Sequence, residues 1–203
     1  MVVLDILNII LLFVCSLIII YQMIFAIASL LIRHKKFEVQ NYFKYHRFAI
    51  LIPAHNEELL LGNTIDNLKK INYPSNLTDI IVIADNCWDK TAEIAKRKGV
   101  VCLERFDKKA IGKGFALAWA LSKIDINKYD AFVILDADTI VNQDFLKEFN
   151  MDLNIGKEII QGYDGVIVTK NNWLARLAHL SDILQFYVYL DGKYKLGLPV
   201  RLL

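Results

Sequence analysis

The chain has 203 residues, with 24 basic and 22 acidic side chains and a formal net charge of +2, which argues against a nucleic-acid partner. Its length is sufficient for one domain with a buried core. Hydrophobic residues make up 55% of the chain and the mean hydropathy is +0.34, both high for a soluble protein.

The first element in chain order is an uncharged segment, residues 6–32, between Asp5 and Arg33. At 1.5 Å per residue a helix of this length is roughly 40 Å long, which exceeds a hydrocarbon core of ~30 Å. A signal peptide has an apolar region of about 7–15 residues that follows positive charge, and this chain shows neither feature. We therefore predict an N-terminal tail (1–5), one transmembrane helix (6–32) and a single-pass membrane protein.

Positive charge follows the apolar segment, beginning with the run "RHKK" at residues 33–36. Because positively charged flanks stay in the cytoplasm, we expect a basic cytoplasmic linker at 33–46 and a cytoplasmic catalytic domain after it. The three cysteines, Cys15, Cys87 and Cys102, show no CxxC spacing. They are typical of packing residues in a reducing compartment.

The remainder of the chain alternates between short apolar runs and helical patterns. Strands are predicted at 47–53, 79–84, 100–104 and 131–135; helices are predicted at 57–70, from Asp89 to Gly99, and at 113–123. Nearly continuous apolar strands between helices predict an α/β domain with a mostly parallel sheet covered on both faces. In such sheets ligands bind beyond the carboxyl ends of the strands, where this chain places its polar clusters.

The C-terminal region is less regular. Residues 158–169 fit another strand or a hairpin around Asp164-Gly165. Residues 172–190 are amphipathic, with a stripe at three- and four-residue steps formed by Trp173, Leu177, Leu180, Leu184 and Tyr187. We expect this stripe to pack in the core, in preference to a role at a membrane surface.

The sequence "DAFVILDADTI" ends an apolar run on Asp136 and Asp138. On a strand both carboxylates would face one side and Ala137 the other. Two carboxylates about 4 Å apart repel by about 4 kcal/mol at an effective dielectric constant near 20. A divalent cation removes this cost, and oxygen ligands suit Mg²⁺ or Mn²⁺. The alternative is an ordinary acidic turn.

Three further polar clusters lie at predicted strand or helix ends. In "IADN", Asp85 can accept hydrogen bonds from a base or a ribose, or cap the next helix. The loop "IPAHNEE" can cradle a nucleotide with backbone amides, or be a turn capped by Asn56. In "GKG", Lys113 can approach a phosphate or remain a solvated surface lysine. The chain has no Walker A loop, and no GxGxxG sequence follows the first strand.

The order and spacing of these four clusters resemble the donor-nucleotide half of family 2 glycosyltransferases with the GT-A fold. The resemblance covers residues 48–139, and more loosely "IIQGY" and "NWLARLAHL" beyond them. It implies a GT-A glycosyltransferase domain over 47–203 that transfers a sugar from a UDP-sugar to an acceptor. A cytoplasmic domain behind a membrane helix is also similar to membrane-bound members of that family.

The resemblance implies a role for particular residues. The nucleotide-sugar-binding positions are Pro53, Ala54, Glu57, Asp85, Lys113 and Asp136. Of these, Asp85 would contact the uracil or ribose, and Lys113 would lie near the nucleotide. Asp136 and Asp138 would hold the Mg²⁺ or Mn²⁺ cofactor, which stabilises negative charge on the departing UDP.

The pattern departs from the family toward the C-terminus. Family 2 enzymes have a further acidic residue that acts as base toward the acceptor, and membrane-bound synthases often have a Q-x-x-R-W motif. Neither occurs here, and the late carboxylates of Asp164, Asp182 and Asp191 are in no such motif. We therefore expect the domain to be incomplete on its acceptor side, with the catalytic base unassigned and the acceptor open among lipid, polysaccharide and protein.

Two other functions are considered. A haloacid dehalogenase-type phosphatase would use Asp136 as a nucleophile, but that motif needs threonine or valine where this chain has Ile140. A membrane-tethered pseudo-transferase would bind the nucleotide sugar without turnover. UDP binding without sugar transfer would distinguish it from an enzyme.

Overall fold

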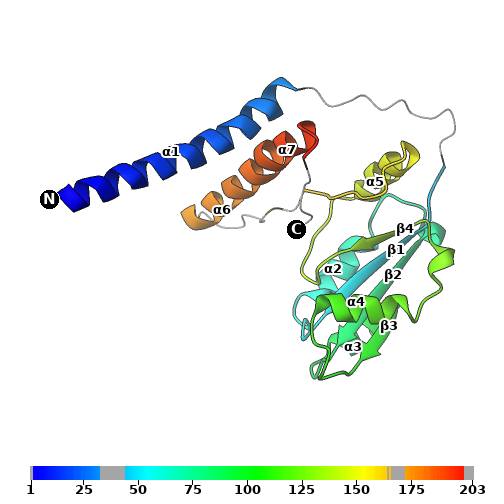
Figure 1. Ribbon diagram of the computed structural model, residues 1–203. Coiled ribbons are helices and arrows are strands. Elements are labelled where there is room, and N and C mark those ends of the chain that lie inside the picture. The colour runs from blue at the N-terminus through cyan, green and yellow to red at the C-terminus, as the bar shows by residue number, and fades with distance from the viewer. Residues whose placement is uncertain (1, 33–43, 164, 166–171, 199–203) are drawn as a thin grey trace. The chain divides into compact units, whose positions relative to one another are not determined.

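The computed structural model describes residues 2–32, 44–163, 165 and 172–198 (Figure 1). The described residues form two compact units. One contains the N-terminal helix together with residues from Gln161 onward, and the other contains the described part of 38–160. Each unit is described by itself.

A four-stranded parallel sheet forms the centre of the second unit, in the order β3-β2-β1-β4 (Figure 1). The strands are β1 (Phe48–Ala54), β2 (Thr78–Asp85), β3 (Val101–Arg105) and β4 (Ala131–Ile134). The predicted α/β architecture with a parallel sheet is therefore confirmed. The four strands predicted between residues 47 and 135 are all present, with ends that differ by one residue at most.

Helices cover both faces of this sheet, because alternate residues of each strand point to opposite faces. Helices α2 (Leu61–Leu68), α3 (Thr91–Arg97) and α5 (Phe145–Asn154) contribute to the core on one face, around Ile50 and Ile52. Helix α4 (Lys113–Leu121) covers the other face with Ala116 and Ala120. Short 3-10 turns, η1 (Ser75–Leu77) and η2 (Ile126–Lys128), precede β2 and β4.

The first helix of this unit is shorter than predicted. Helix α2 begins at Leu61, whereas the sequence predicted a start at Glu57. The backbone N–H groups of Glu57 and Glu58 donate to the side chains of Thr91 and Asp89, at 2.8 Å and 3.0 Å. Since these bonds hold residues 57–60 in a turn against the next loop, the regular helix starts four residues later.

The sequence did not predict α5. Its fully buried Asn150 anchors the segment that leads into β1. The Asn150 carboxamide accepts from the backbone N–H of His46 at 2.8 Å and donates to the backbone oxygen of Lys44 at 2.9 Å. The hydroxyl of Tyr73 also donates to Asn150 Oδ1, at 2.9 Å. A polar residue therefore fixes where the sheet begins.

The other unit is helical. Helix α1 (Val2–Leu31) lies beside a continuous helical segment made of α6 (Trp173–Ile183), the π-helical η3 (Leu184–Leu190) and α7 (Asp191–Lys195) (Figure 1). Residues Leu4–Leu31 of α1 are long and apolar enough, by length and composition, to cross a membrane.

Within the unit that contains α1, the apolar stripe of residues 172–190 is not buried in a core. Trp173 is 67% exposed, and the other four stripe residues are 50–59% exposed. Tyr187 of this stripe contacts other parts of its own unit: the centroid of its ring lies 5.2 Å from that of Tyr163, and its backbone oxygen accepts from the Ser29 hydroxyl at 2.8 Å. Residues 158–163 form no strand, and the remainder of the predicted strand or hairpin lies mostly outside the described residues, Asp164 included.

Candidate functional site

The sheet order places a crevice at the carboxyl ends of the central strands. From β1 the chain moves outward to β2 and β3, and then returns to the opposite side of β1 with β4. Such a reversal of strand order opens a crevice in which ligands of α/β sheets bind. A cavity of about 330 Å³ lies there, lined by Pro53, Ala54, His55, Glu57, Asp85, Ile111, Gly112, Lys113 and Ala116.

Five residues predicted to bind the nucleotide sugar line this one cavity: Pro53, Ala54, Glu57, Asp85 and Lys113. They come from three separate motifs, at the ends of β1 and β2 and at the start of α4. The lining is completed by four residues that were not among the predicted site residues: His55, Ile111, Gly112 and Ala116. Their positions beside the predicted residues in the same two motifs were the available signal.

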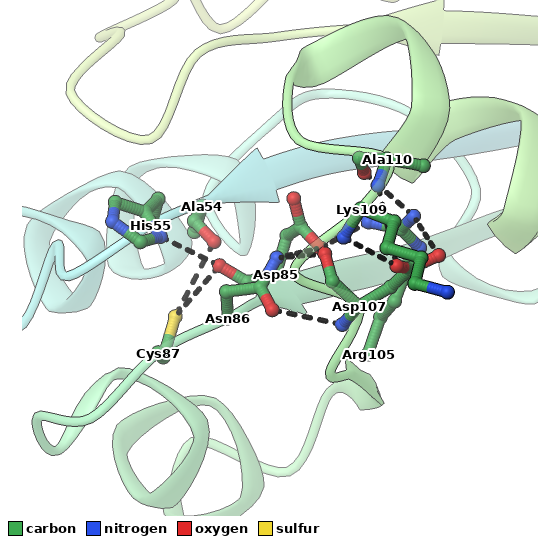
Figure 2. A network of polar contacts seen from close by, with 9 residues as sticks. All are labelled: Ala54, His55, Asp85, Asn86, Cys87, Arg105, Asp107, Lys109 and Ala110. Atoms are coloured by element: carbon green, nitrogen blue, oxygen red, sulfur yellow. Dashed lines mark hydrogen bonds and ion pairs between the residues drawn. The ribbon is translucent and has the colours of Figure 1, made fainter.

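Asp85 lines the cavity and is held by a buried ion pair with Arg105 (Figure 2). An Arg105 guanidinium nitrogen lies 2.6 Å from Asp85 Oδ1, and the two side chains are only 5% and 9% exposed. Arg105 also donates to Asp107 at 3.1 Å and to the backbone oxygen of Ala110 at 2.7 Å. The guanidinium fork therefore joins the end of β2 to the loop before α4.

Sequence reasoning missed Arg105. It ends β3 and pairs in register with Asp85 of β2. The sequence shows an arginine at the end of a predicted strand. That it pairs with Asp85 can be inferred only when the register of β2 with β3 is known.

Asn86 connects the same two loops (Figure 2). Its backbone has a φ of 52°, in the left-handed region that asparagine tolerates better than most residues. Its carboxamide accepts from the Asp107 N–H at 2.8 Å and donates to Asp85 Oδ1 at 3.1 Å. The backbone N–H groups of Lys109 and Ala110 donate to Asp107 and lower the pKa of its carboxyl group. Asp107 therefore remains an acceptor that organises this loop.

The loop after β1 is tied to the loop after β2 (Figure 2). His55 Nδ1 lies 2.7 Å from the backbone oxygen of Asp85, to which only a protonated nitrogen can donate. The Cys87 thiol lies 3.4 Å from the backbone oxygen of Ala54. Burial raises the pKa of Cys87, which keeps the thiol protonated. Both contacts therefore hold Ala54, His55 and Asp85, three residues of the cavity lining, in position.

The backbone amides of the "IPAHNEE" loop are not all free to bind phosphate. The N–H groups of Glu57 and Glu58 are occupied by Thr91 and Asp89. Helix α2 also begins beyond them. The loop therefore contributes lining surface to the cavity, and these two amides do not form the cradle that the sequence suggested.

Asp136 lies beside the cavity and is connected to it through Lys113. The ammonium of Lys113 is 2.5 Å from Asp136 Oδ1, and the two side chains are 51% and 57% exposed. Asp136 and Asp138 follow the end of β4 in a turn, both exposed, with the buried Ala137 between them. Thr64 of α2 donates to the Ala137 backbone oxygen at 2.7 Å. This buried bond fixes the turn that presents both carboxylates.

The donor groups at this turn fit a hard divalent cation. Two exposed carboxylates provide oxygen ligands, and Mg²⁺ or Mn²⁺ usually completes its shell with waters and substrate phosphates. The Lys113 ammonium already stands as a cation against Asp136. Within the described parts of the chain there is no cluster of three or more histidine, cysteine or acidic side chains. Solvent and substrate oxygens are ligands that could complete the coordination shell of such a cation.

Known proteins show the same fold and family. The mannosyltransferase PcManGT from Pyrobaculum calidifontis, solved with GDP-Man and Mn²⁺, superposes with a TM-score of 0.53 at 22% identity. That match covers 66% of this chain and 39% of the mannosyltransferase, and it shows a common GT-A-like fold.

Curated relatives match by sequence. The protein MJ1222 of Methanocaldococcus jannaschii is 31% identical over 152 residues, which is 71% of this chain and 58% of that protein. The beta-monoglucosyldiacylglycerol synthase of Nostoc sp. is 31% identical over 119 residues, or 56% of this chain and 24% of the synthase. The chain thus spans less than two thirds of either relative. The sequence profile of glycosyl transferase family 2 matches residues 49–196, and the chain belongs to this family.

Proposed function

We propose that this chain binds a nucleotide-sugar donor, a UDP-sugar, in the 330 Å³ cavity and takes part in transfer of the sugar to an acceptor. The observation that carries the proposal is the convergence of Pro53, Ala54, Glu57, Asp85 and Lys113, from three motifs, on one cavity beside Asp136. Family membership supports this chemistry over a phosphatase with an aspartyl nucleophile.

Asp85 is suited to recognise the base or ribose. Among the described residues, both hydrogen bonds to its carboxylate reach Oδ1, from Arg105 and Asn86. Oδ2 is then available to accept from a uracil N–H or a ribose hydroxyl. Because Arg105 prevents the carboxylate from rotating, the acceptor atom is pre-organised and little entropy is lost on binding.

Lys113, Asp136 and Asp138 are suited to the diphosphate. Asp136 and Asp138 would hold a divalent cation, and such a cation would stabilise the charge that develops on the leaving nucleotide. Lys113 would exchange Asp136 for a phosphate oxygen as the donor binds, since its ammonium lies at the edge of the same cavity. Asp136 would then be free to act as a ligand.

We further propose that α1 crosses a membrane once, with the basic linker and the GT-A domain, residues 47–203, on the cytoplasmic side. The length and uncharged character of Leu4–Leu31 support the crossing. The run "RHKK" after it supports the orientation. Among lipid, polysaccharide and protein acceptors, the name of the Nostoc relative, a glucosyldiacylglycerol synthase, favours a lipid.

Calorimetry on the full chain in detergent tests donor binding. We expect UDP to bind in the presence of Mn²⁺, and Asp85→Asn to weaken binding by about tenfold or more through lost recognition. Asp136→Asn and Asp138→Asn should remove the dependence on Mn²⁺. The matched control is Asp144→Asn, because Asp144 also pairs with an exposed lysine, at 2.7 Å, but lies outside the cavity lining.

Equal UDP affinity in Asp85→Asn and Asp144→Asn would refute the assigned site. Transfer is measured separately, with radiolabelled UDP-sugars and extracted membrane lipids. Binding without transfer to any acceptor would favour the pseudo-transferase.

A further inference from the structure

The segment that follows β4 is held by side chains of α2 and not by a neighbouring strand. Within the described part of the chain, residues 139–142 belong to no helix or strand. The Asn67 carboxamide accepts from the backbone N–H of Val141 at 2.8 Å and donates to the backbone oxygen of Val141 at 3.2 Å. One side chain therefore satisfies both backbone groups of Val141, as a residue of a paired strand would.

Two further bonds attach the same segment to α2 and to the turn after it. Thr64, one helical turn before Asn67, donates to the Ala137 backbone oxygen at 2.7 Å. The backbone N–H of Asn72 donates to the backbone oxygen of Gln143 at 2.7 Å. The segment is therefore attached at its start, in its middle and at its end.

Helix α2 is a firm support for these bonds. Leu61, Ile65 and Leu68 of this helix are at most 1% exposed and belong to the core on one face of the sheet. Val141 packs against the same core. Because a close-packed core resists displacement, the side chains of α2 hold the segment at a fixed place relative to the sheet.

The two carboxylates at the start of this segment are held in different ways. Asp136 pairs with Lys113 at 2.5 Å. Among the described residues, none forms a hydrogen bond or an ion pair with the carboxylate of Asp138. Its position therefore depends on its backbone, which lies between the attachments at Ala137 and Val141. With the first attachment alone, the backbone between them could still rotate.

We propose that Asn67 is a positioning residue for the divalent cation, because it fixes the backbone from which Asp138 reaches the metal. This inference rests on the proposed function, in which Asp136 and Asp138 hold Mg²⁺ or Mn²⁺. Metal–ligand distances must be correct to within about 0.2 Å, so a small shift of the backbone weakens coordination. Loss of a residue that holds a metal ligand in place typically costs about 10–100-fold in metal affinity.

Titration of the full chain in detergent with Mn²⁺, in the presence of UDP, tests the proposal. Free Mn²⁺ is followed by its electron paramagnetic resonance signal. We expect Asn67→Leu to weaken Mn²⁺ binding about tenfold. The affinity for UDP without Mn²⁺ should stay within about twofold of the wild-type value, because Asp85 is held by Arg105 and not by α2.

The matched control is Asn150→Leu. It also removes a carboxamide that donates to and accepts from the backbone, but the groups concerned precede β1. The control should lower the urea midpoint and leave the Mn²⁺ affinity within about twofold of the wild-type value. A double-mutant cycle tests whether Asn67 acts through Asp138. In a chain that already carries Asp138→Asn, Asn67→Leu should weaken Mn²⁺ binding no further.

Wild-type Mn²⁺ affinity in Asn67→Leu would overturn the proposal. An equal loss of affinity in Asn150→Leu, or an undiminished further loss in the Asp138→Asn chain, would also overturn it, since a purely structural role gives these results. If Asn67→Leu does not fold, Asn67→Ser, which provides one polar atom in place of two, is judged by the same outcomes.

Asp138→Asn alone separates this inference from the proposed function. If that variant binds Mn²⁺ as the wild type does, the proposed metal site fails and the role of Asn67 fails with it. UDP binding without Mn²⁺, measured on the same preparations, shows independently whether the donor site stands.

Discussion

Replacing Arg105 with methionine tests how the donor site is built. The substitution keeps most of the apolar volume of the side chain but removes the guanidinium that lies 2.6 Å from Asp85. Asp85 would then remain as a buried carboxylate, 9% exposed, and among the described residues only the side-chain amide of Asn86 would still donate to it. Asp107 and the Ala110 oxygen would lose a donor as well.

Arg105→Met is expected to lower the free energy of unfolding substantially. Removing one partner of a buried ion pair typically destabilises a protein by about 3–5 kcal/mol, because the other charge remains buried without compensation. A domain is stable by about 5–15 kcal/mol, so Arg105→Met should lower the urea midpoint substantially. The same variant should weaken UDP binding, since the Asp85 carboxylate is then free to rotate.

Urea denaturation followed by circular dichroism measures the first effect and calorimetry the second. The control is Lys96→Met, which removes a cation from an exposed pair with Glu104, 2.5 Å apart, with side chains 59% and 37% exposed. We expect it to leave the urea midpoint nearly unchanged, because water and salt screen an exposed pair. Asp85→Asn/Arg105→Met should recover part of the stability but none of the UDP binding.

Equal urea midpoints for Arg105→Met and Lys96→Met would refute the reasoning. If Arg105→Met does not fold, the double variant decides, because a stable double variant with normal UDP affinity would show that the pair does not organise the site.

Three further substitutions test other parts of the structure. Thr64→Val leaves the buried Ala137 oxygen without its donor and should lower the free energy of unfolding, measured by urea denaturation, by about 1–2 kcal/mol. It should also weaken Mn²⁺-dependent UDP binding. Unchanged binding would show that this hydrogen bond does not hold the turn that carries Asp136 and Asp138. Burial raises the pKa of Asp79, but hydrogen bonds from two cationic side chains and a tyrosine lower it more, from 3.8 to about 2. The stabilisation is thus complete above about pH 4 and is lost as the pH falls through about 2. Asp79→Asn should therefore cost about 1–2 kcal/mol at pH 7 and progressively less as the pH falls through about 2, as followed by urea denaturation against pH. Asn150→Leu leaves the backbone N–H of His46, just before β1, without its partner, while the Lys44 oxygen keeps Asn154 as a donor. The substitution should cost about 1–3 kcal/mol, and an unchanged urea midpoint would contradict this.

The fold could be predicted from the sequence where one local pattern decides the structure. Strands β1 and β2 are covered on both faces, so their sequences are nearly continuous apolar runs bounded by polar clusters. Helix α5 was missed because few of its residues are buried apolar ones and its key buried residue, Asn150, is polar. The start of α2 was misplaced because its position depends on Thr91 and Asp89, which lie thirty residues further along the chain.

The site was predictable as a set of strand ends but not as a network. Pro53, Asp85 and Lys113 stand out because each belongs to a polar cluster that interrupts an apolar pattern. The partner of Asp85 could not be predicted from the sequence, because Arg105 lies beside it only through the register of β2 with β3. The stripe at residues 173–187 predicted a helix correctly, but periodicity does not state what covers the apolar face.

Gly192 of α7 packs so closely on Phe25 of α1 that an added Cβ would lie 2.1 Å from the Phe25 backbone oxygen, and this contact has a consequence for biosynthesis. The contact beside it, from Ser29 to Asp191, joins residues 162 positions apart. At about 5–20 residues per second, the ribosome needs roughly 10–30 s after α1 to make its partner. During that interval Ser29 and the backbone of Phe25 must wait without the helix that covers them. A slow synthesis rate, or a larger residue at position 192, would therefore prolong the time in which a nascent α1 can pair wrongly.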